Sequence, residues 1–166
     1  MDRAYSVTGD NITVSGAPIL VFINPAAGGV GVPGFEVLRC WVSQRANATS
    51  AQQGVGLGTK VTAFPTLTSA TPAKVGGLGL PTANITGGTA GAAGTCGINA
   101  SANGGGTEIN TTPDNFNVLN GWLFVATPPE TMPFMPGGTS GFFHKFTSTP
   151  STLTGWSFGV IYREIG

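Results

Sequence analysis

Apolar residues in this sequence fall into short runs that are separated by glycine- and proline-rich turns. The clearest run is the last one, in which Trp156, Phe158, Val160 and Tyr162 occupy every second position. A period of two is typical of a strand with one buried face, because successive side chains of a strand point to opposite sides. We therefore expect these four side chains to lie in the core.

Other runs predict further strands. They are rich in β-branched and aromatic residues and end at turn residues, and they span 3–14 (as one or two strands), 19–23, 35–44, 55–64, 122–125 and 142–146. The run from Ile19 to Ile23 is apolar throughout, which predicts burial on both faces. Residues 46–53 are the one place where a helical turn is considered.

Residues 35–44 allow two interpretations. As a strand, which we favour, the segment carries Leu38, Cys40 and Val42 on one face and Val37, Arg39 and Trp41 on the other. As a helix, it brings Phe35, Leu38 and Val42 together. The β-branched content and the lack of a capping residue favour the strand.

Strands at this spacing predict an all-β fold, a single β-sandwich or jelly-roll-like domain over residues 1–166. Residues 65–115 stand apart, because they are rich in Gly, Thr and Ala and contain few apolar residues. We expect this region to form short, weak strands on a projecting arm or lobe inserted in the domain. The alternative is a loop that becomes ordered only against a neighbouring subunit.

The chain is poor in charge. Only 8% of its residues are charged, against roughly 25% in typical domains, whereas 40% are hydrophobic. That apolar content argues against disorder, and the sparse charge favours a surface that becomes covered by assembly. The seven basic residues form no cluster, so nucleic-acid binding is not expected. No apolar run is long enough for a membrane span, and the first residues do not resemble a signal peptide.

The residues that carry chemistry are few and scattered, so we expect no enzyme. His144 is the only histidine and lies between Phe143 and Lys145 in a predicted strand, without a nucleophile motif anywhere in the chain. The two cysteines, Cys40 and Cys96, are far apart and are expected to be buried thiols rather than a disulfide. No metal site, cofactor site or catalytic residue is predicted.

Four apolar residues are candidates for a subunit or lattice interface. Trp41 lies on a predicted strand, and Met132, Phe134 and Met135 lie in a proline-rich loop that would lose little entropy on docking. The alternative for this loop is that it folds back over the core. Trp41 and Trp122 are also considered for a sugar-binding face.

Both ends of the chain resemble small virion structural proteins of tailed bacteriophages, the head decoration or cement protein family. The similar stretches are short and lie at 3–7, 24–26, 37–44, 117–122, 127–128, 153–154 and 164–166. They include Asn24-Pro25-Ala26 and Asn117-Val118-Leu119-Asn120-Gly121-Trp122. Residues 65–115 are not part of the resemblance.

The resemblance implies a β-sandwich that sits as a homotrimer on the capsid lattice and clamps the major capsid protein. It therefore implies a location in the virion after assembly in the host cytoplasm, and it supplies no catalytic residues. Two alternatives stay open. One is a tail, neck or fibre component of the same particle, and the other is a carbohydrate-binding β-sandwich on its surface.

Overall fold

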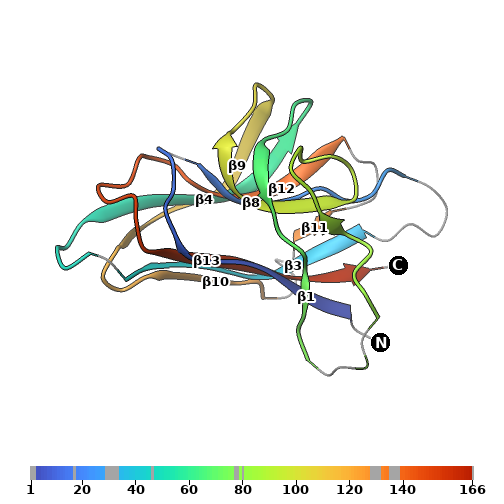
Figure 1. The fold of residues 1–166 in the computed structure, drawn as a ribbon, viewed down its shortest axis with the longest axis horizontal. Coiled ribbons are helices and arrows are strands. Elements are labelled where there is room, and N and C mark those ends of the chain that lie inside the picture. The colour runs from blue at the N-terminus through green and yellow to red at the C-terminus, as the bar shows by residue number, and fades with distance from the viewer. Residues whose placement is uncertain are drawn as a thin grey trace.

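The protein is a sandwich of two β-sheets. The computed structural model describes residues 3–16, 18–28, 34–45, 47–76, 79, 81–127, 132–134 and 139–165. Over these residues the chain forms strands and loops without any helix, and the two sheets pack face to face (Figure 1). The prediction of an all-β sandwich is therefore confirmed, whereas the jelly-roll connectivity stays a prediction. The helical turn considered for 46–53 does not occur in its described part, where β4 begins at Gln52.

Sheet A is the lower layer in Figure 1 and has the strand order β10-β3-β13-β1-β6, with β11 also paired to β3. Its strands are β1 (Arg3–Ile12), β3 (Gly34–Gln44), β6 (Ala73–Lys74), β10 (Trp122–Val125), β11 (Met132–Phe134) and β13 (Trp156–Ile165). All of these pairings are antiparallel. The long strands β3 and β13 pair along their whole lengths and form the centre of the sheet.

Sheet B is the upper layer and has the order β5-β8-β2-β12-β4-β9. Its strands are β2 (Ile19–Ile23), β4 (Gln52–Val61), β5 (Thr66–Ser69), β7 (Thr86–Gly87), β8 (Thr95–Ala102), β9 (Thr107–Asn117) and β12 (Ser140–Phe146). The pairings are antiparallel except that of the short β7 with β8. Strand β9 forms one edge of this sheet.

The main core lies between the two sheets. Trp156, Phe158, Val160 and Tyr162 all have an exposed fraction of 0%, so the expected buried face of the last strand is confirmed. Strand β2 is buried along its whole length, also as expected. Its inner side chains join the main core, whereas those on its other face join a second, smaller cluster on the outside of sheet B, made of Ile19, Phe22, Leu67, Ala100 and Phe143.

A β-bulge in β3 changes which side chains face the core. Cys40 lies opposite Val160 of β13, but Val37 lies opposite Tyr162, so one extra residue, Leu38, is accommodated between them. Such a bulge reverses the alternation of the strand. The strand interpretation of 35–44 is confirmed, but the prediction that Val37 shares a face with Arg39 and Trp41 is wrong, because Val37 has an exposed fraction of 0% and joins the main core with Cys40 and Val42.

Residues 65–115 contribute strands to both sheets instead of forming the expected inserted arm. Strand β8 pairs with β2, β9 pairs with β4, and β6 pairs with β1 on the other sheet. The region needs few apolar residues because β9 is an edge strand that is largely open to solvent. In β8, Cys96, Ile98 and Ala100 supply the buried positions.

Strand β9 can lie close to β4 because the facing positions of β4 are glycines. A Cβ atom added to Gly56 would lie 2.5 Å from the Asn110 side chain, and one added to Gly54 would lie 3.3 Å from Asn115 Oδ1. At Gly58 the obstacle is backbone, since the added Cβ would lie 2.0 Å from the Ile109 carbonyl oxygen. The glycines of β4 therefore decide whether β9 can join the sheet.

The substitution Gly58→Ala is expected to lower the free energy of unfolding by about 1–3 kcal/mol, the usual effect of overpacking. The new methyl group would meet the Ile109 carbonyl oxygen and also the Phe143 ring, at 2.7 Å from Cζ. Chemical denaturation measures the loss. Gly105→Ala is the matched control, because a Cβ there meets no atom within 4 Å. Equal stability of the two variants would contradict the close approach of β9 to β4.

Candidate interaction surface

The outer face of sheet A is a regular array of side chains. Residues that pair across antiparallel strands lie side by side and point to the same side of the sheet. The first row across the sheet holds Leu123, Trp41, Gly159 and Thr8. The second holds Val125, Arg39, Ile161 and Ser6. The third holds Pro133, Glu36, Arg163 and Ala4.

Four apolar side chains gather in the first two rows, and we call them the apolar patch: Trp41, Leu123, Val125 and Ile161. Leu123 and Val125 each have an exposed fraction of 53%, and Trp41 and Ile161 are half-buried. The six-membered ring of Trp41 lies over Gly159, where an added Cβ would be 2.4 Å from Cζ2 and 2.6 Å from Cη2. Glycine at this position leaves room for the indole to lie against the sheet.

Ion pairs border the apolar patch on two sides. In the third row, Arg163 donates to the Glu36 carboxylate through both Nε and Nη2. At the opposite end of the face, Asp10 accepts hydrogen bonds from Ser157 and Arg45. The bond from Ser157, followed by Arg45, holds the pKa of Asp10 below its usual value. An apolar centre with a polar rim is the usual anatomy of a protein interface.

The interface residues predicted from the sequence fall on different sides of sheet A. Trp41 lies on the outer face, as part of the apolar patch. Met132 and Phe134 lie on the inner face, partly buried against the main core. Met135 is outside the described residues. Trp122, the other tryptophan considered for a sugar-binding face, points inward, with its ring 5.6 Å from that of His144, so it does not share a face with Trp41.

Strand pairing explains the inward position of the proline-rich segment. Strand β11 places Phe134 opposite Phe35 of β3, whose side chain faces the core. The two rings stack with their centroids 5.0 Å apart, and Phe134 also meets Phe142 of sheet B edge-on at 5.5 Å. The described part of the loop thus folds over the core, which is the alternative stated for it above.

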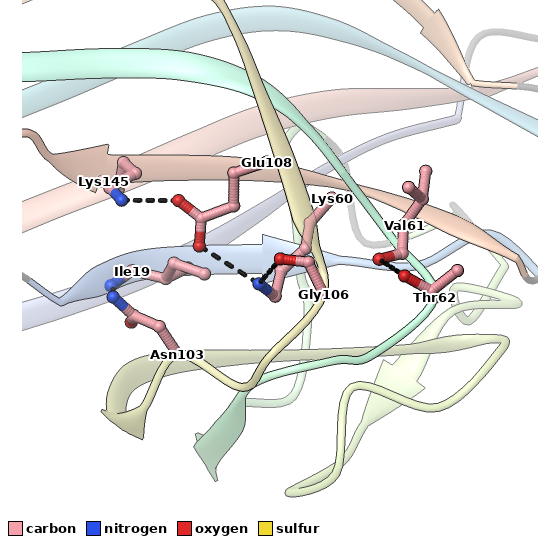
Figure 2. A network of polar contacts seen from close by, with 8 residues as sticks. All are labelled: Ile19, Lys60, Val61, Thr62, Asn103, Gly106, Glu108 and Lys145. Carbon is pink, nitrogen blue, oxygen red and sulfur yellow. Dashed lines mark hydrogen bonds and ion pairs between the residues drawn. The ribbon is translucent and has the colours of Figure 1, made fainter.

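A second polar cluster lies on sheet B (Figure 2). Lys60 has an exposed fraction of 0%, and its Nζ donates to Glu108 Oε1 at 3.1 Å and to the Gly106 carbonyl oxygen at 3.2 Å. Lys145 Nζ donates to Glu108 Oε2 at 2.6 Å. Burial alone would raise the pKa of Glu108, but the bonds from Lys145 and Lys60 outweigh it, so the pKa is lowered. The cluster joins β4, β9 and β12, and we assign it a structural role.

The remaining chemistry-bearing side chains are isolated. No group of three or more His, Cys, Asp or Glu residues suited to a metal ion occurs in the described part of the chain. Cys40 and Cys96 are free and buried, as expected, and burial raises the pKa of Cys96 to about 12 and that of Cys40 well above its usual value. His144 is buried beside Trp122, and neither of its ring nitrogens has a hydrogen-bond partner among the described residues.

No family model, curated protein or solved structure matches this chain in sequence or fold comparisons. Within the described residues there is also no helix that is long and apolar enough to cross a membrane. The outer face of sheet A is therefore the candidate site with the strongest geometric support, since it combines exposed apolar side chains with an ordered polar rim.

Proposed function

We propose that this chain is a non-enzymatic virion structural protein of a tailed bacteriophage, a capsid decoration or cement protein that binds and stabilises the head lattice. The observation that carries the proposal is the apolar patch on the outer face of sheet A. Trp41, Leu123 and Val125 lie side by side on this face, and Leu123 and Val125 each have an exposed fraction of 53%. Such exposed patches mark interaction sites, and tryptophan is enriched at the centres of interfaces.

Two further observations support a structural role on the phage head. The ends of the chain resemble decoration proteins, and the segments that carry this resemblance include β1 and β3 of sheet A. The sparse charge, 8% of all residues, suits a protein whose surface is largely covered after assembly. In this role the outer face of sheet A contacts the major capsid protein, and the protein acts as a homotrimer.

Binding to heads that lack this protein tests the proposal. The purified chain is expected to bind such heads in a saturable manner and to raise the temperature at which they release their contents. Trp41→Ala should weaken binding by about thirtyfold or more, the effect typical of a central interface tryptophan. Light scattering on the free protein should give three times the 16.7 kDa mass of one chain.

Leu153→Ala is the matched control for this experiment. Leu153 is also an exposed apolar residue, at 39%, but it lies in the loop between β12 and β13, away from the apolar patch. This variant should bind like the wild type. A protein that does not bind heads and is absent from purified virions would overturn the proposed function. Its copy number in the virion separates head decoration, with hundreds of copies, from a tail component.

A carbohydrate-binding role is the second candidate, and the position of Trp41 favours it. An indole that lies against a sheet surface, beside the polar side chain of Thr8, offers a platform on which a sugar ring can stack. A glycan array tests this role directly. Retention of a glycan by the wild type but not by Trp41→Ala would favour it over lattice binding.

A further inference from the structure

Arg39 occupies an unusual place on the outer face of sheet A. Its neighbours across the strands are Val125 of β10 and Ile161 of β13, and Trp41 follows on the same side of its own strand. A cation thus stands at the border of the apolar patch, with apolar neighbours on three sides and the Glu36–Arg163 ion pair of the third row beyond it. Arg39 is exposed, so in the isolated chain water solvates its guanidinium group.

The acidic groups that the described residues place on this face already have partners. Glu36 accepts from Arg163, and Asp10 accepts from Arg45 and Ser157. The side chain of Arg39, in contrast, makes no hydrogen bond or ion pair with any residue that the structure describes. Any partner that covers the apolar patch removes water from this guanidinium and must replace it with acceptors, because an unpaired buried charge is strongly unfavourable.

A second copy of the chain does not meet this requirement on the same face. If two copies met face to face about a two-fold axis near the patch centre, their Arg39 side chains would approach each other. Like charges placed together at an interface disfavour that pairing. The partner is therefore a different surface, one with a carboxylate among apolar groups. A carboxylate matches the planar fork of a guanidinium and forms two parallel hydrogen bonds with it.

We propose that the outer face of sheet A binds a protein partner that places an aspartate or glutamate carboxylate on Arg39, at the border of the apolar patch. The inference rests on the proposed function, and in that setting the partner is a subunit of the capsid lattice. Trp41, Leu123, Val125 and Ile161 exclude water around the ion pair. Arg39 then selects the acidic site on the partner.

Charge substitutions test the inference on heads that lack the protein. Arg39→Glu should weaken binding by about a hundredfold or more, because it sets two carboxylates against each other. Lys74→Glu is the matched control, with the same change in net charge on the exposed strand β6 at the far edge of sheet A. It should bind within about twofold of the wild type. Thermal unfolding confirms that both variants are folded.

The substitution Arg39→Lys provides a second, covalent test. It places a primary amine at position 39, which a carbodiimide couples to a carboxylate in contact with it, forming an amide and releasing the reagent as a urea. Mass spectrometry of treated, decorated heads should find a cross-link between position 39 and an acidic residue of the capsid subunit. The wild type, whose guanidinium does not couple, should lack that cross-link.

The outcomes separate this inference from the proposed function. If the wild type binds heads but Arg39→Glu binds equally well, the carboxylate contact is wrong and the decoration role stands. If the wild type does not bind heads at all, both are overturned. Retention on free glycans by the wild type, with no cross-link at position 39, would overturn the inference in favour of a sugar ligand.

Discussion

Replacing Phe158 with alanine is expected to lower the free energy of unfolding by about 3–5 kcal/mol, the range measured for fully buried phenylalanines. Phe158 has an exposed fraction of 0% and lies on β13, opposite Val42 of β3 and Gly9 of β1. Its ring covers Gly9, where an added Cβ would be 2.8 Å from Cζ. Truncation leaves a cavity in the middle of sheet A that strands paired on both sides cannot easily close.

Ile161→Ala is the control on the opposite face of the same strand. Ile161 is half-buried in the apolar patch, so its truncation should cost about 1 kcal/mol or less. Chemical denaturation of both variants gives the comparison. A smaller loss of unfolding free energy for Phe158→Ala than for Ile161→Ala would contradict this register. It would mean that Ile161 faces the core and Phe158 faces solvent, since a shift of one residue exchanges the two faces of a strand.

The strands that were predicted well are those in which the strand's own sequence shows which side chains are buried. Strand β2 is apolar at every position and is buried on both faces, with the bounds Ile19–Ile23 that the sequence indicates. Strand β13 has a large apolar side chain at every second position from Trp156 to Tyr162 and buries that face. In both cases the pattern of apolar residues is a local signal, and burial follows from it directly.

The bulge in β3 had no comparable signal. Leu38 is an ordinary apolar residue, and nothing in its neighbourhood marks an extra residue in the ladder. The bulge lies where the partner of β3 on one side changes from β10, which pairs up to Arg39, to β11, which pairs from Val37, while β13 pairs along the other side. Pairing between distant segments is not encoded in the local pattern, so the inward position of Val37 could not be predicted.

The candidate surface was predictable only in part for the same reason. Alternation in β3 indicated that Trp41 faces away from Cys40, and the structure agrees. Leu123 and Val125 lie in a short run in which every residue is apolar, so the sequence does not show which side faces the core. Their place beside Trp41 depends on the register of β10 against β3.

Residues 65–115 show how little apolar content an edge strand requires. Strand β9 exposes most of its side chains, and its contact with β4 relies on backbone pairing and on the glycines of β4. The glycines that permit this contact lie at 54–58, outside the region 65–115 whose structure they help to explain. A scarcity of apolar residues indicates an exposed strand as well as a detached arm, and only the pairing distinguishes the two.

Acidification from pH 7 to pH 5 is expected to lower the free energy of unfolding by about 2 kcal/mol through His144 alone. The imidazole is completely buried, between Val21 and Leu57 on the neighbouring strands, with Trp122 facing it from sheet A. Neither ring nitrogen has a hydrogen-bond partner among the described residues. Burial therefore lowers the pKa of His144 from 6.5 to about 3, because the core offers nothing to stabilise the charged ring.

The sign of the effect follows from proton binding. Below pH 6.5 the unfolded chain binds a proton at this histidine, whereas the folded protein does so only near pH 3. The unfolded state is thus favoured increasingly as the pH falls, by about 1.4 kcal/mol for each pH unit in that window. His144 is the only histidine of the chain, so no other side chain ordinarily titrates between pH 5 and 7.

The variant His144→Leu isolates this contribution. Leucine fits an apolar site and leaves no unsatisfied nitrogen, so the variant should be at least as stable as the wild type at pH 7. Its stability should change little between pH 7 and pH 5, and the gap between the two proteins should widen as the pH falls.

Below about pH 4.5 both should lose stability further, because the lowered pKa of Glu108 makes its protonation unfavourable in the folded state. Urea denaturation at pH 7, 6 and 5 measures the difference. If the free energies of unfolding of the two proteins fell in parallel from pH 7 to pH 5, His144 would have a hydrogen-bond partner or access to water. That result would contradict its isolation in the core.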